Sequence, residues 1–118
     1  MKDRIIGYKV FESNWVCIDF KYEVGKTYHL DEEVELRERG FHFCQRLTDC
    51  YRYYTFNPNN RAAVVAASGT IIIEEYQCCT DTISIIRELS WGEILSIIDT
   101  ELSGGKPRTV DYYRNHHT

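Results

Sequence analysis

The sequence predicts an α+β fold, a mainly antiparallel sheet of six or seven strands with two short helices. Three observations lead to this prediction. Short runs of β-branched and aromatic residues recur along the chain, separated by turn residues. Only two segments place apolar residues at helical spacing. The chain has 118 residues, of which 43% are hydrophobic, so it can form one core but not two.

Five extended segments are expected before the first helix. The run from Arg4 to Phe11 is rich in β-forming residues, and Gly7 inside it indicates a bulge or the close approach of another backbone. The alternating residues from Trp15 to Tyr22 predict a second strand. Shorter extended pieces are expected at Thr27–Leu30, Val34–Leu36 and Gly40–Cys44.

A helix and three strands are expected next. Apolar residues at i, i+3, i+4 and i+7 predict a helix from Leu47 to Tyr54, which a proline and three asparagines then end. The segment Arg61–Ala67 is apolar on both faces and therefore predicts a central strand. Gly69 predicts a turn, and strands are expected at Thr70–Tyr76 and Thr82–Leu89.

The clearest local signal is the sequence Ser90-Trp91-Gly92-Glu93. This is a capping box placed directly before an apolar helical run that reaches Leu102. The stretch Ser103-Gly104-Gly105-Lys106-Pro107 ends the helix. A single α+β domain is thus expected over residues 1–107, followed by a polar and aromatic C-terminal tail over residues 108–118.

Charge and cysteine usage exclude several function classes. Fourteen basic and eighteen acidic residues give a net charge of −4, which argues against direct nucleic-acid binding. The N-terminus lacks the apolar run of a signal peptide, and no membrane association is expected. The five cysteines form no Cys-x-x-Cys pair, so we expect no metal site. They predict a cytoplasmic protein whose thiols are mostly buried.

The candidate contact residues are polar and aromatic groups on short elements. Nine tyrosines and two tryptophans exceed the needs of a core this small. They either cover the core with their hydroxyls in water or form a binding surface. His42 lies between Phe41 and Phe43 and points away from both rings, either as an ordinary strand histidine or as a ligand contact. The residues predicted to contact a ligand or partner are His42, Tyr51, Arg52, Tyr54 and Arg61.

Several stretches of the chain resemble an uncharacterised domain family that is common in phages and mobile elements of low-GC Gram-positive bacteria. The resemblance covers roughly residues 5 to 98, and its motifs carry no known chemistry. The stretches that carry it are Gly7-Tyr8-Lys9-Val10-Phe11, Tyr22-Glu23-Val24-Gly25-Lys26-Thr27-Tyr28, Arg39-Gly40-Phe41-His42-Phe43-Cys44, Asp49-Cys50-Tyr51-Arg52-Tyr53-Tyr54 and Arg87-Glu88-Leu89-Ser90-Trp91.

The order of elements is also similar to the ADP-ribosyltransferase fold. In that superfamily a Gly-aromatic-x-Phe strand precedes a tyrosine-bearing helix, and a later strand presents a catalytic glutamate. Gly40-Phe41-His42-Phe43 and Tyr54 match the middle element, and Glu88 matches the acid. Lys9 stands where the first strand of the superfamily carries an arginine or histidine.

Two functions are expected from these resemblances. The first is a small phage-type, non-enzymatic binding protein without a cofactor. It would inhibit a host immune effector in the manner of an anti-CRISPR protein, or sequester a nucleotide-derived signal. The alternative is an NAD-dependent ADP-ribosyltransferase-like enzyme, in which Glu88 stabilises the oxocarbenium-like ribose while His42 and Lys9 position the NAD or ADP-ribose-type ligand. Self-assembly into a homo-oligomer through edge strands is compatible with both functions.

Overall fold

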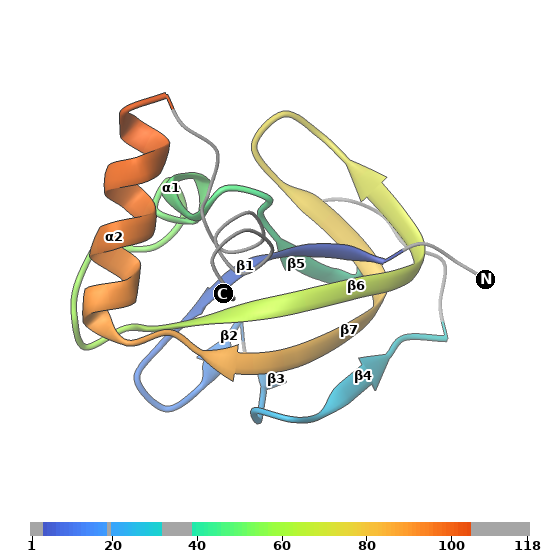
Figure 1. Ribbon diagram of the computed structural model, residues 1–118. Coiled ribbons are helices and arrows are strands. Elements are labelled where there is room, and N and C mark those ends of the chain that lie inside the picture. Colours follow the sequence, from blue (N-terminus) through green and yellow to red (C-terminus); the bar gives the residue numbers. More distant parts are fainter. Residues whose placement is uncertain (1–3, 19, 32–38, 105–118) are drawn as a thin grey trace, which may run out of the picture.

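The computed structural model describes residues 4–18, 20–31 and 39–104 (Figure 1). It confirms an α+β fold with an antiparallel sheet and two helices. The described strands divide into a five-stranded sheet and a separate two-stranded hairpin. The elements are β1 (Ile5–Phe11), β2 (Val16–Cys17), β3 (Phe20–Lys21), β4 (Thr27–His29), β5 (Phe41–Phe43), α1 (Leu47–Cys50), β6 (Arg61–Ile73), β7 (Cys78–Glu88) and α2 (Trp91–Leu102).

The main sheet curls until its two sides meet. Strands β1, β6, β7 and β4 are neighbours in that order, and β5 pairs with the first residues of β7. Beyond β5, Tyr8 and Cys44 exchange two backbone hydrogen bonds, from Tyr8 N to Cys44 O at 2.7 Å and from Cys44 N to Tyr8 O at 2.8 Å. Strands β1, β6, β7 and β5 therefore form a closed ring of neighbours.

Gly7 permits this closure. A Cβ atom at that position would lie 2.5 Å from the carbonyl oxygen of Cys44 and 2.8 Å from the ring of Phe43. The expected close approach of another backbone is therefore confirmed, and the backbone belongs to the end of β5.

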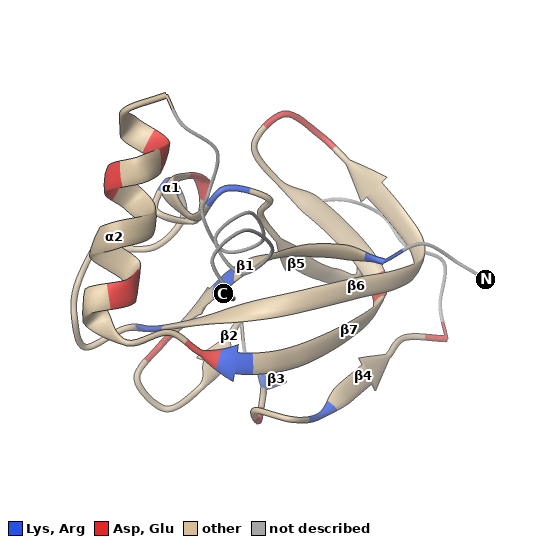
Figure 2. Cartoon of the chain, viewed as in Figure 1, with Lys and Arg blue, Asp and Glu red and all other residues tan. Residues whose placement is uncertain are grey.

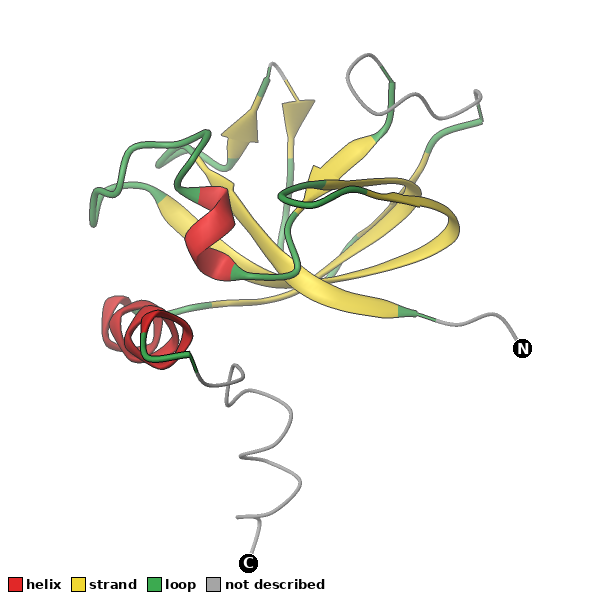
Figure 3. Cartoon of the chain, turned by 90° about the horizontal axis from the view of Figure 1, so that it is seen from above, coloured by secondary structure: helices red, strands yellow, loops and turns green. Residues whose placement is uncertain are grey.

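The two faces of β6 belong to two separate cores, which explains why the strand is apolar on both. Ala63 and Val65 point into the ring, where they join Phe11, Phe43 and Ile83. Ala62 and Val64 point outward and pack under both helices, against Leu47 of α1 and Ile94 of α2 among others. Figure 3 shows the helices outside the strands. The predicted central position of this strand, between β1 and β7, is confirmed.

The segment Trp15–Tyr22 is not one strand, as its alternation predicted. It folds back on itself as the hairpin β2–β3, in which Val16 pairs with Lys21 and Cys17 with Phe20. Trp15 and Ile18 take positive φ angles of 68° and 48°, which turn the chain on either side of β2. Alternation looks the same in one long strand and in two short ones, and no glycine marks the turn in the sequence.

Gly69 bends a strand but does not end it. Strand β6 runs from Arg61 to Ile73, and its register with β7 shifts between Ser68 and Ile71. Gly69 takes a φ of 70° at this bulge, and the hydroxyl of Thr80 lies 2.7 Å from the Ser68 carbonyl. Because the bulged chain continues in the same direction, the expected strand Arg61–Ala67 and most of the expected strand Thr70–Tyr76 form one element, which ends at Ile73.

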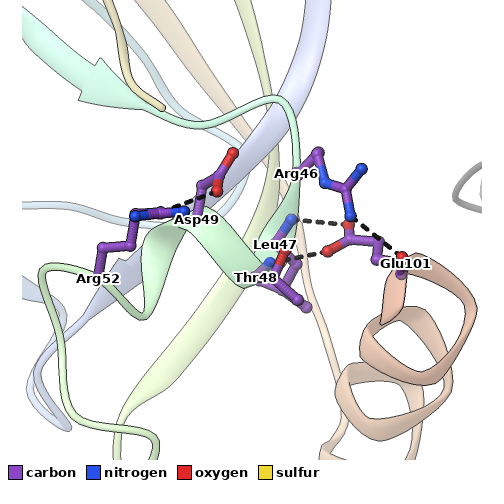
Figure 4. A network of polar contacts seen from close by, with 6 residues as sticks. All are labelled: Arg46, Leu47, Thr48, Asp49, Arg52 and Glu101. Atoms are coloured by element: carbon purple, nitrogen blue, oxygen red, sulfur yellow. Dashed lines mark hydrogen bonds and ion pairs between the residues drawn. The ribbon is translucent and has the colours of Figure 1, made fainter. Parts of the chain in front are cut away.

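The helices differ in how they begin. The expected helix from Leu47 to Tyr54 is a regular α-helix only as far as Cys50. The expected capping box of α2 is confirmed, because Ser90 and Glu93 form reciprocal hydrogen bonds between side chain and backbone. Helix α1 has no cap from its own segment. Its start is capped from α2 instead (Figure 4), because Leu47 N and Thr48 N each donate to one carboxylate oxygen of Glu101 at 2.8 Å. Arg46 adds a hydrogen bond to the Glu101 carbonyl.

The expected extended piece Val34–Leu36 and the tail 108–118 lie outside the described residues.

Substituting Glu101 should destabilise the fold. The side chain is only 2% exposed, so Glu101→Gln presents an amide group to a buried backbone N–H that needs an acceptor. We expect a loss of about 2 kcal/mol in the free energy of unfolding, measured by urea denaturation. Asp99→Asn, on the exposed side of the same helix, is the control and should change little. Equal effects of the two substitutions would contradict the capping role.

Gly7→Ala should open the contact between β1 and β5. The added methyl group has no room against the Cys44 carbonyl, so we expect a loss of about 2 kcal/mol in the free energy of unfolding. Gly92→Ala is the matched control, because a Cβ there meets nothing closer than the Ser90 hydroxyl at 4.0 Å. In an exposed helix this control should stabilise the fold by up to about 1 kcal/mol. Thermal unfolding of both variants distinguishes a steric effect from a general intolerance of alanine.

Candidate functional site

A cavity of about 410 Å³ lies where β1, β5, the β2–β3 hairpin and the end of the α1 segment meet. It is within the usual size range of small-molecule sites. Its wall contains three of the residues singled out from the sequence, Lys9, His42 and Tyr54. Cys17, Cys44 and Cys50 add thiols to the wall, and Glu12, Ile18, Tyr53 and Gln77 also line it. We call this cavity the Lys9 pocket.

Lys9 is a buried cation without a carboxylate. The residue is 4% exposed, and its Nζ donates a hydrogen bond to the main-chain carbonyl of His42. Nζ also lies 5.3 Å from the ring centre of Tyr22 and 5.9 Å from that of Phe11. In the described part of the chain, no Asp or Glu oxygen lies within ion-pair distance of Nζ.

This environment compensates the buried charge only in part. Burying an ammonium group costs several kcal/mol unless charged or hydrogen-bonding partners replace water. One carbonyl oxygen and two ring faces are weaker partners than a carboxylate. An ammonium group has three N–H donors, and the described residues supply a hydrogen-bond acceptor for one of them. The remaining donors suit an anionic group placed in the Lys9 pocket.

The Cys50 thiol of the pocket is a poor nucleophile. A hydrogen bond to Cys44, together with burial, raises the pKa of Cys50 well above its usual value. The hydroxyl of Tyr54 lies 2.7 Å from Cys17 Sγ, and burial is the main cause that raises the pKa of this tyrosine. Cys50 and Tyr54 therefore keep their protons at neutral pH. All five cysteines of the chain are buried and no disulfide joins them, as expected from the sequence.

Two exposed side chains lie at the mouth of the Lys9 pocket. Ile18 is 78% exposed and Tyr53 is 51% exposed, yet both belong to its lining. The positive φ of Ile18 is costly for a β-branched residue and directs an apolar side chain into water. Residues held in such conformations concentrate at functional sites.

Glu88 and Arg61 lie in a different place from Lys9 and His42. They line a groove of about 860 Å³ between the ends of β6 and β7 and the start of α2. Arg61 Nη1 lies 3.0 and 3.2 Å from the two oxygens of Glu88, and its Nε donates to the Ser13 carbonyl at 2.6 Å. In the sheet, Ala63 of β6 pairs with Lys9 of β1 on one side and with Glu88 of β7 on the other. The Lys9 side chain nevertheless extends toward β5, whereas Glu88 is held by Arg61.

Tyr51 and Arg52 line a third groove, of about 480 Å³, beside α1. The guanidinium of Arg52 lies 3.6 Å from the ring centre of Tyr76 and pairs with Asp49 at 3.1 Å. Tyr51 packs edge-on against Phe56, and burial raises its pKa to about 12. The five predicted contact residues are therefore distributed over three grooves: His42 and Tyr54 share the Lys9 pocket, Tyr51 and Arg52 share the groove beside α1, and Arg61 lies in the groove with Glu88.

Most lining residues of the Lys9 pocket were not among the predicted site residues, and these include Glu12, Cys17, Ile18 and Tyr53. Tyr53 carried a signal, since it belongs to the tyrosine-rich stretch after Leu47. Ile18 and Cys17 carried none, because the hairpin that brings them to the pocket was interpreted as one strand.

The described residues show no other obvious site. Basic and acidic residues are distributed over several elements of the fold (Figure 2). Among these residues, no group of three or more His, Cys, Asp or Glu side chains is placed to hold a metal ion. No helix in the described ranges is long and apolar enough to cross a membrane.

Lys9→Met tests whether the buried charge serves the fold. Since a buried charge without a carboxylate contributes little to stability, the ligand-free variant should unfold within about 1 kcal/mol of the parent or be more stable. Thermal and urea unfolding measure this difference. A loss of about 3 kcal/mol or more would show that the ammonium group is part of the framework.

Comparison with known proteins gives a family without a described activity. No curated protein and no solved structure matches the chain. A family model described as a domain of unknown function, DUF7666, matches residues 5–97. The match confirms the expectation of an uncharacterised domain over most of the chain. It includes β1, β5, α1 and β7, and with them every residue discussed in the Lys9 pocket. The chain belongs to the DUF7666 family.

Proposed function

We propose that this chain is a non-enzymatic binding protein that holds a small, nucleotide-derived molecule in the Lys9 pocket. The observation that carries the proposal is the buried ammonium group of Lys9, which has one main-chain acceptor and no carboxylate among the described residues. An anionic ligand would supply the missing partner.

The rest of the pocket fits such a ligand. Its wall combines few charged groups with aromatic and apolar side chains, which is typical of small-molecule sites. The rings of His42, Tyr53 and Tyr54 offer flat surfaces suited to a nucleobase.

The position of Glu88 favours binding over turnover. Cleavage of NAD in the manner of an ADP-ribosyltransferase needs a carboxylate beside the ribose. Glu88 lines the groove at the ends of β6 and β7, where both of its oxygens face Arg61. Glu12 does line the Lys9 pocket, but on its exposed side.

The biological context that we propose follows from the resemblance of the chain to domains of phages and mobile elements. In a host cell, such a binding protein would act by sequestering a nucleotide-derived signal of host defence. Blocking a host effector protein is the other route, and the enclosed position of Lys9 supports the first. The cytoplasm of the host cell is the compartment in which such a signal would be met.

A thermal-shift panel tests the proposal. The ligands are mononucleotides, NAD, ADP-ribose and cyclic dinucleotides, each followed by mass spectrometry of the ligand. A ligand at about one hundred times its dissociation constant should stabilise the fold by about 2.7 kcal/mol, or several degrees. Lys9→Met should abolish the shift, whereas Lys26→Met should keep it, because Lys26 is exposed, lies outside the lining of the Lys9 pocket and forms an ion pair with Glu23.

Each outcome of the panel has a defined meaning. A shift that needs Lys9 and leaves the ligand intact supports sequestration. A ligand that is consumed supports the enzymatic alternative, and Glu88→Gln would then be the next variant. The absence of any shift would contradict the proposal and favour a protein partner, to be sought by pull-down.

A further inference from the structure

We infer that the ligand of the Lys9 pocket carries a single acidic group, bound at Lys9, and one planar ring, stacked on Tyr53. In chemical terms this is a nucleoside monophosphate. The inference rests on the proposed function and specifies its ligand class.

The charge count of the pocket supports one acidic group. Lys9 is the one lysine or arginine among the described residues that line it, and Glu12 is the one carboxylate. One ammonium group can contact a single anionic group directly and offset about one of its charges. A second phosphate would find no further lysine or arginine among the described residues of the wall and would lie in the same cavity as the Glu12 carboxylate. Repulsion between like charges therefore disfavours diphosphates and cyclic dinucleotides.

The contacts of the aromatic side chains indicate which of them can stack on a ring of the ligand. Phe43 is buried in the core inside the ring of strands, and the Tyr54 hydroxyl is bound to Cys17. Tyr53 is half exposed, and in the described part of the chain it makes no ring or cation contact. Tyr51 and Tyr76, in contrast, are covered by Phe56 and Arg52. The face of Tyr53 is thus available at the mouth of the pocket.

The β2–β3 hairpin adds apolar surface at the mouth of the Lys9 pocket. Ile18 lines the pocket with its side chain largely in water and its backbone at a φ of 48°. A ligand ring that enters here removes apolar surface from contact with water, and this gain is absent for an inorganic phosphate ion.

Isothermal titration calorimetry with AMP, adenosine and ADP-ribose tests the inference. AMP should bind the unmodified chain at least about tenfold more tightly than adenosine, because a hydrogen bond to a charged group contributes that much. Lys9→Met should reduce AMP binding to the level of adenosine and leave adenosine unchanged. ADP-ribose should bind no more tightly than AMP.

Substitution of Tyr53 tests whether a planar ring of the ligand stacks on this side chain. Tyr53→Ala should weaken AMP and adenosine by the same factor, about tenfold, whereas Tyr53→Phe should retain binding. Tyr76→Ala is the matched control, since Tyr76 stacks on Arg52 in another groove. The comparison of AMP with adenosine uses the unmodified chain, so it tests the acidic group even where a variant fails to fold.

The results that overturn the inference differ from those that overturn the proposed function. Equal affinity for AMP and adenosine, or tighter binding of ADP-ribose or a cyclic dinucleotide through Lys9, contradicts the single acidic group and leaves the binding function standing. Unchanged affinity in Tyr53→Ala contradicts the stacking. No binding of any compound overturns both the inference and the proposed function.

Discussion

The pair of backbone hydrogen bonds between Tyr8 and Cys44 is the interaction on which the candidate site depends. It closes the ring of strands by joining β1 to the end of β5. Lys9 follows Tyr8 in the chain and His42 lies two residues before Cys44, so the same contact brings the Lys9 ammonium to the His42 carbonyl. The contact is available only because position 7 has no side chain. One glycine thus sets both the closure of the sheet and the wall of the pocket.

Two buried charged side chains, Glu101 and Lys9, differ in how fully the described residues compensate them. Both carboxylate oxygens of Glu101 accept a backbone N–H, and these bonds tie α2 to the start of α1 across the sequence. The site is compensated internally, as a buried charge must be if it is to support the fold. Lys9 is buried to a similar degree, yet the described residues give it one hydrogen-bond acceptor, the His42 carbonyl, with the rings of Phe11 and Tyr22 nearby. That incomplete compensation points to a partner from outside the chain.

The parts of the fold that sequence predicts well are those with a signal of their own. The capping box of α2 is a local pattern with a local cause, and the two-sided apolar character of β6 follows directly from its position between two cores. The errors arose where one pattern fits two structures. Alternating residues describe a strand and a hairpin equally well at Trp15–Tyr22, and a glycine with positive φ serves a turn and a bulge equally well at position 69. The distinction depends on neighbours distant in sequence, such as Thr80 beneath the bulge.

The same limit applies to the site. Sequence identified Lys9, His42 and Tyr54 as chemically suitable residues, but the grouping with Glu88 or Arg61 required knowledge of where each strand end lies. The structure separates these groups by chemistry as well as by place. Arg61 and Glu88 compensate each other, so their groove presents a neutralised pair. Near Lys9, the Cys50 thiol and the Tyr54 hydroxyl keep their protons, because hydrogen bonds to neighbouring thiols and burial raise their pKa values. The proposal of sequestration therefore rests on the Lys9 ammonium, whose one hydrogen-bond acceptor among the described residues is the His42 carbonyl, and on the distance in the fold between this group and the Arg61–Glu88 pair.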